Sequence, residues 1–137
     1  MRARLFLVSA LMPALVGCQS PSGAEVPVCD GLALDREAVA VQEGGADPQP
    51  VRIQCWREVD RERIQLWFAT PAGPSCHQLA RVELVESADA ISVALIMVRD
   101  DAPNAGACPE ESQDLLTEVD LQASVGERML LDAGSAE

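Results

Sequence analysis

The sequence predicts an all-β domain, a small antiparallel sandwich or meander stapled by two disulfides. Three observations predict this class: apolar residues recur at every second position in several short runs, turn-forming residues separate these runs, and four cysteines follow residue 18. A period of two is the pattern of a half-buried strand. Many short strands at such spacing are typical of sandwiches and meanders, and 137 residues favour a single domain.

Two alternating runs lie in the first half of the chain. The apolar face of the run at 51–59 carries Val51, Ile53, Cys55 and Val59. Trp56 lies on the opposite side of that strand. In the run from Ile64 to Ala69, every second residue from Ile64 is apolar and is expected in the core, with Trp67 on the other face.

Further runs follow in the second half. The segment 82–86 alternates apolar and charged residues, and Ile91 to Val98 is almost continuously apolar, which is typical of a central strand. The run 115–123 alternates again, and a last short strand starts at Met129. Turn signals separate the runs at Gly44-Gly45, Asp47-Pro48, Pro71 to Pro74, Ser87 to Asp89 and Asp100 to Gly106.

One or two short helices are compatible with this pattern. The segment from Leu32 to Gln42 fits a helix and a strand equally well. A helical turn after Pro109 is a second candidate, because Pro suits the first helical position and the acidic Glu110 and Glu111 favour the positive end of a helix.

The N-terminus is typical of a secretory signal. Arg2 and Arg4 precede the apolar run from Leu5 to Val16. At 1.5 Å per residue this run covers roughly 18 Å, short of the roughly 30 Å hydrocarbon core, so a permanent membrane span is disfavoured.

The motif Leu15-Val16-Gly17-Cys18 resembles the lipobox of bacterial lipoproteins. The resemblance implies cleavage before Cys18 and a diacylglyceryl thioether on that residue. Several acyl chains together give stable anchoring. The predicted partner is therefore a membrane, reached through the lipid anchor on Cys18, at the extracytoplasmic face of the cell envelope. The alternative is an ordinary signal peptide cut nearby, with Cys18 lost or left as a thiol.

These features divide the chain into four predicted parts: a signal peptide at 1–17, a flexible tether at 18–26, a disulfide-bonded β-domain at 27–133 and a disordered tail at 134–137. Gln19, next to the lipidated position, is compatible with sorting to an outer membrane, and the choice between inner and outer membrane stays open. Cys29, Cys55, Cys76 and Cys108 form an even set, and in an oxidising compartment we expect two disulfides. Spacing alone leaves three connectivities open, of which we favour Cys29 with Cys55 and Cys76 with Cys108.

The second half also resembles a group of small secreted or lipid-anchored bacterial proteins that have no assigned activity. The residues that carry this resemblance lie between about 60 and 132: Cys76, Leu79, 82–86, 91–95, Cys108, Val119, Leu121, Gly126-Glu127-Arg128 and Asp132. In that group the two cysteines bridge the loop before one strand to the loop after the next strand, which supports pairing Cys76 with Cys108. The resemblance implies a fold and a localisation, and it implies no catalytic or binding activity.

Charge makes nucleic-acid binding very unfavourable. The chain has 22 acidic and 10 basic residues and a net charge of -12. Without the two leader arginines the balance is 8 minus 22, or -14. Nucleic-acid affinity rests on neutralising phosphates with Lys and Arg. The basic residues concentrate at Arg52, Arg57, Arg61 and Arg63, but Glu58, Asp60 and Glu62 interleave with the last three.

No recognisable enzyme motif is present, and we expect a protein without catalysis, cofactor or metal. His77 is the only His and follows Cys76 directly. Adjacent residues in an extended chain point to opposite faces, so a thiol–imidazole pair is disfavoured. Widely spaced cysteines disfavour zinc. Acidic residues near 100–114 supply candidate calcium ligands or a carboxylate pair, but the calcium-loop template fails at Ala102 or Pro103.

Trp56 and Trp67 are the candidate binding residues, because each lies opposite the apolar face of its strand. They form an exposed aromatic patch for a partner if that face is open, and they belong to the core if it is covered. The sequence therefore predicts a lipid-anchored envelope protein that acts as an interaction or ligand-binding module for an unknown envelope protein or small ligand. The alternative function is a small calcium-dependent or carboxylate-based binding protein or hydrolase.

Overall fold

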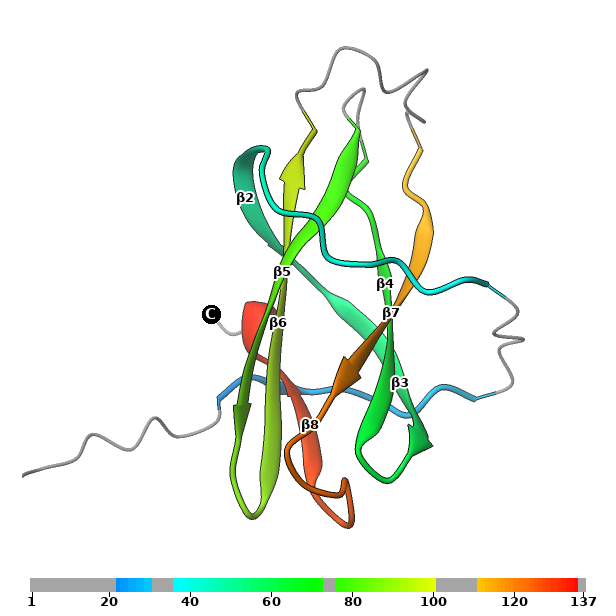
Figure 1. Ribbon diagram of the computed structural model, residues 1–137, viewed down its shortest axis with the longest axis vertical. Coiled ribbons are helices and arrows are strands. Elements are labelled where there is room, and N and C mark those ends of the chain that lie inside the picture. Colours follow the sequence, from blue (N-terminus) through cyan, green and yellow to red (C-terminus); the bar gives the residue numbers. More distant parts are fainter. Residues whose placement is uncertain (1–21, 31–35, 73–75, 101–110, 136–137) are drawn as a thin grey trace, which may run out of the picture.

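The computed structural model describes residues 22–30, 36–72, 76–100 and 111–135, and these form an all-β fold as predicted (Figure 1). The elements are β1 (Ala24–Glu25), β2 (Ala46–Val51), β3 (Ile53–Asp60), β4 (Arg63–Ala69), β5 (His77–Glu86), β6 (Ala90–Arg99), β7 (Asp114–Asp120), β8 (Met129–Asp132) and the 3-10 turn η1 (Ala133–Ser135). The described part contains no helix long and apolar enough to cross a membrane.

The strands form two sheets, which we name sheet A and sheet B. Sheet A is centred on β6, which pairs along its length with β5 in an antiparallel hairpin. The other side of β6 is shared by two strands, because β8 pairs with its first half in parallel and β2 with its second half antiparallel. Strand β1 continues sheet A beyond β8, and sheet B consists of β3, β4 and β7 in antiparallel order.

The main core lies between the two sheets. It contains the predicted inward residues of β4 and β6, among which Ile64, Leu66, Phe68, Ile91 and Leu95 are completely buried. Both faces of β6 are covered, as its continuous apolar run indicates. The alternation in the sequence therefore places the core correctly in these strands.

Strand β2 passes directly into β3 at Arg52, where the chain leaves sheet A for sheet B. The buried carboxylate of Asp132, only 2% exposed, holds this corner. It accepts a hydrogen bond from the Ile53 N–H at 2.9 Å and another from the Gly134 N–H at 3.0 Å. The end of β8 therefore fixes the point at which the chain changes sheets.

Two extended segments close the sides of the sandwich, and both cross the molecule in Figure 1. The first, 26–30, runs from β8 to the edge of β3, where Pro27 and Cys29 exchange backbone hydrogen bonds with Trp56. The second, 36–45, runs from β7 to β5, because Val39 N–H bonds Leu116 O and Gln42 N–H bonds Leu79 O. These segments satisfy strand edges that otherwise offer unpaired backbone groups to other chains.

Several predicted boundaries need correction. The fold begins earlier than residue 27, because β1 pairs with β8 and Val26 is buried. The described part of 32–42 is neither helix nor strand, since it crosses between two edges. Gly134 and Ser135, expected in a disordered tail, complete η1. The predicted helical turn after Pro109 lies almost entirely outside the described residues.

Strand β2 and the face of β3 also differ from the prediction. The expected turn at Asp47-Pro48 lies inside β2, an edge strand in which Asp47 adopts a φ of 54°. Prolines are tolerated in such edge strands. In β3, a register shift between Ile53 and Cys55 interrupts the alternation. Val59, expected in the core, is consequently exposed.

Candidate functional site

The two tryptophans occupy opposite faces of sheet B and do not form one patch. Trp67 is 7% exposed and packs on the outer face with Cys55 and Leu116. The guanidinium of Arg36 lies 6.0 Å from its ring centroid, within range of a cation–π contact. Trp56 instead packs against the main core, and its Nε1–H donates to Val26 O at 3.1 Å. Packing is therefore the alternative that the structure supports for both rings.

One of the two predicted disulfides, Cys29–Cys55, is present within the described residues, with its Cα atoms 5.0 Å apart. It ties the segment 26–30 to β3. Cys76 is also disulfide-bonded, but Cys108 lies outside the described residues, so the pairing between these two stays a prediction. The lipidation site Cys18 lies outside them as well.

His77 begins β5 and is paired across the sheet with Arg99. It lines a small cavity of about 240 Å³ together with Val39, Leu79 and Leu115. Because Cys76 is oxidised, a thiol–imidazole pair is unsupported. Of the candidate calcium ligands, Asp100 is described and 101–110 are not, and the described residues contain no cluster of three potential metal ligands.

A larger open groove of about 540 Å³ lies where β2 passes into β3. Its lining comes from the segment 26–30, the corner between the sheets and the end of β4: Pro27, Gln49, Pro50, Val51, Arg52, Gln54, Ala69, Thr70 and Pro71. We name it the Arg52 groove. The described residues of its lining include one cation and no acidic residue, although the whole chain has 22 acidic side chains. The groove is therefore a local exception to the negative charge of the protein.

Arg52 also differs from most other arginines of the fold in having no partner among the described residues. Six others have one: Arg36 with Asp114 O, Arg57 with Gln65, Arg63 with Asp120, Arg81 with Glu83, Arg99 with Asp47 and Arg128 with Glu86. Arg61 shares the lack of a described partner, but it lies in the β3–β4 turn and does not line the groove. Arg52 thus offers an unused guanidinium inside a groove.

The backbone that carries Arg52 is held on both sides. Val51 and Ile53 are buried in the core, and the Ile53 N–H is bonded to Asp132. The side chains of Gln49 and Gln54 flank Arg52 in the lining, are exposed and have no described hydrogen-bond partner. Three side chains rich in donors therefore project from a rigid corner, which lowers the entropy cost of binding.

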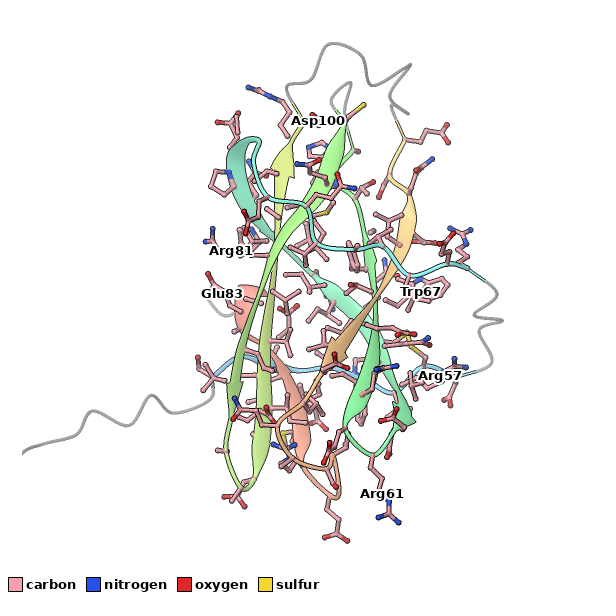
Figure 2. The ribbon with its side chains drawn as sticks, viewed as in Figure 1. Arg57, Arg61, Trp67, Arg81, Glu83 and Asp100 are labelled. Atoms are coloured by element: carbon pink, nitrogen blue, oxygen red, sulfur yellow. A yellow bond between two sulfur atoms is a disulfide. The ribbon has the colours of Figure 1, made fainter. Side chains whose placement is uncertain are left out.

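The outer face of sheet B carries a polar ladder instead of a groove. Arg57 donates to Gln65 at 2.8 Å, and Gln65 donates to Glu118 at 3.0 Å. Beside them Asp120 raises the pKa of Arg63 through a hydrogen bond at 2.9 Å. Figure 2 shows Arg57 and Trp67 on this side of the molecule and the Arg81–Glu83 pair on the opposite side. These charges already satisfy one another.

No known protein family matches this chain, and no curated protein or solved structure matches it either.

The Arg52 groove was not predicted from the sequence, although one signal was present. Acidic residues interleave with the other three arginines of the basic concentration, whereas Arg52 stands between Val51 and Ile53. An arginine without acidic neighbours in so acidic a chain is more available for a ligand. The three prolines of the groove lie far apart in sequence, so their convergence depends on the tertiary fold.

Proposed function

We propose that this protein is a lipid-anchored extracytoplasmic envelope protein whose β-domain is an interaction or ligand-binding module. The observation that carries the proposal is the Cys29–Cys55 disulfide. Structural disulfides persist in oxidising compartments outside the cytoplasm, which agrees with a secretory leader ending at Cys18. The same bond fastens the first segment of the fold to β3, at the end of the domain that leads back to the anchor.

The proposed tether is shorter than the sequence alone indicates. Ser22 already belongs to the fold, because its carbonyl accepts a hydrogen bond from the Ser92 Oγ at 2.6 Å. Four Cα-to-Cα steps separate Cys18 from Ser22, and even when fully extended they span at most about 14 Å. A lipid on Cys18 consequently holds the domain beside the bilayer and makes it a membrane-proximal module.

The Arg52 groove supports the binding part of the proposal. It combines an open concave surface, apolar proline walls and a few exposed polar side chains, which is the usual composition of a ligand site. The side chains of Gln49, Arg52 and Gln54 have no partner among the described residues. The Thr70 hydroxyl of the lining, by contrast, accepts a hydrogen bond from the Gln113 N–H. A groove built from the corner between two sheets is also rigid, which suits recognition.

Intact mass of the protein purified from the membranes of a bacterial host tests this proposal. We expect the mass of residues 18–137 plus a diacylglyceryl group, with a further loss of two hydrogens for each disulfide, reversed on reduction. Cys18→Ala should move the protein from the membrane to the soluble extracytoplasmic fraction, whereas the control Ser20→Ala should leave it on the membrane. An unlipidated chain with free thiols at Cys29 and Cys55 would overturn the proposal.

A further inference from the structure

We propose that the Arg52 groove binds the free C-terminus of an extended peptide whose last residues are apolar. This inference rests on the proposed function, because it names the ligand of the binding module. It assigns the terminal carboxylate to Arg52, the peptide groups to Gln49 and Gln54, and the apolar side chains to the proline walls.

The carboxylate follows from charge. Among the described residues that line the groove, Arg52 is the only charged one, and its side chain has no ion pair or hydrogen bond within the described part of the chain. A guanidinium presents donors in a planar fork that matches both oxygens of a carboxylate. In a chain with a net charge of -12, an arginine in a groove whose described lining has no Asp or Glu is a favourable place for an anion.

The peptide follows from the neighbours of Arg52. Each of the side chains of Gln49 and Gln54 offers an amide with donors and an acceptor, the same groups that a peptide unit needs. Both are exposed and unused by the fold. A ligand that carries a carboxylate beside amide groups therefore uses all three side chains, whereas a simple aliphatic acid uses only Arg52.

The apolar character of the last residues of the peptide follows from the proline walls of the Arg52 groove. Pro27, Pro50 and Pro71 come from three separate parts of the chain and line the same groove as the three polar side chains. Proline has no backbone N–H and presents a rigid apolar ring. Such walls favour ligand side chains that bury apolar surface, and they add no competing donor for the carboxylate.

Fluorescence anisotropy with short labelled peptides tests the inference on the protein purified from membranes. The probes are N-terminally fluorescein-labelled tetrapeptides Ala-Ala-Pro-Val, Ala-Ala-Pro-Leu and Ala-Ala-Pro-Phe, each made as the free acid and as the C-terminal amide. We expect at least one free acid to bind and its amide to bind about ten-fold more weakly or worse, because a charged hydrogen bond is lost. Binding should weaken as salt is added.

Two arginine variants provide a matched pair. Arg52→Gln should weaken binding of the free acid roughly ten-fold or more, whereas Arg61→Gln removes the other unpartnered arginine and should change binding less than about two-fold. Gln54→Ala should weaken binding of the acid and the amide by the same factor, because it removes a contact to the peptide group rather than to the carboxylate.

The inference is overturned if none of the free acids binds, if acid and amide bind equally, or if Arg52→Gln and Arg61→Gln weaken binding alike. Octanoate competes as a source of a carboxylate without amide groups, and equal displacement by octanoate and by unlabelled peptide would also overturn it. Lipidation is measured separately by intact mass, so a failed peptide test and a failed anchoring test remain distinguishable.

Discussion

Arg128 and Arg52 place the same side chain in opposite situations. Arg128 is 8% exposed, pairs with Glu86 at 3.0 Å, and donates further hydrogen bonds to the carbonyls of Ser87, Ala123 and Ser124. Glu86 in turn accepts a bond from the Gln122 N–H. Arg52 is exposed and has no described partner. A guanidinium whose donors are used holds the fold together, and one whose donors are unused is available to a ligand.

The largest expected effect comes from breaking the buried pair. Arg128→Gln leaves Glu86 without its counterion. It also removes the donor to the Ser87 carbonyl in the β5–β6 turn and to the Ala123 carbonyl in the loop before β8. Removing one partner of a buried pair costs about 3–5 kcal/mol, and we expect urea denaturation to show a loss of this size. Arg81→Gln breaks the exposed Arg81–Glu83 pair and serves as the control, with a change below about 1 kcal/mol. Similar losses in both variants would contradict the comparison.

A second prediction concerns the wall of the Arg52 groove. Replacing Cys29 and Cys55 together by Ala removes a disulfide that spans 26 residues. The loop-entropy argument gives a loss of about 3.5 kcal/mol. The segment with Pro27 then keeps its backbone bonds to Trp56 and the hydrogen bond from the Trp56 Nε1–H to Val26 O, but it loses its covalent link to β3. Thermal melts should show the lower stability, and peptide binding should weaken as well. An unchanged melting temperature would show that the Cys29–Cys55 disulfide does not constrain the chain.

The corner carboxylate is a third test. Asp132→Asn replaces one acceptor oxygen by an NH₂ group, so either the Ile53 N–H or the Gly134 N–H loses its partner. A buried unsatisfied donor costs about 1–3 kcal/mol. We expect a loss of about 2 kcal/mol in urea denaturation. Asp120→Asn, at an exposed ion pair of sheet B, is the control and should leave stability nearly unchanged. Equal losses in the two variants would show that the hydrogen bonds of Asp132 at the β2–β3 corner do not stabilise the fold.

The smallest expected effect on stability is that of Arg52→Gln, and it tests most directly the difference between Arg52 and Arg128. Arg52→Gln should leave the free energy of unfolding within about 0.5 kcal/mol of the parent, because a surface substitution away from structural features has little effect. The same substitution should still weaken peptide binding. A large loss of stability in this variant would mean that Arg52 holds the fold, and the groove would then lose its unused cation.

The sequence predicts a strand well where the strand's own residues show a clear pattern of apolar positions. Alternation at 64–69 and 115–123 and the apolar run at 91–98 give the correct elements and most of the core. It fails in β2, where Asp47-Pro48 indicates a turn, because an edge strand tolerates residues that a central strand does not. It fails again at Trp56, where a register shift that depends on β4 reverses the face.

The candidate site depends on the fold in the same way. The sequence alone is enough to predict the strands at 64–69, 82–86 and 91–98, the excess of acidic residues, the cysteines that can form disulfides and the isolation of Arg52 from acidic neighbours, because these depend on composition and local periodicity. Only the tertiary structure decided that β2 passes into β3 between two sheets and that Asp132, near the other end of the chain, fixes this corner. The physical reason is that a groove is made by distant segments whose pairing no local pattern specifies: Pro27, Arg52 and Pro71 meet only once both sheets have formed.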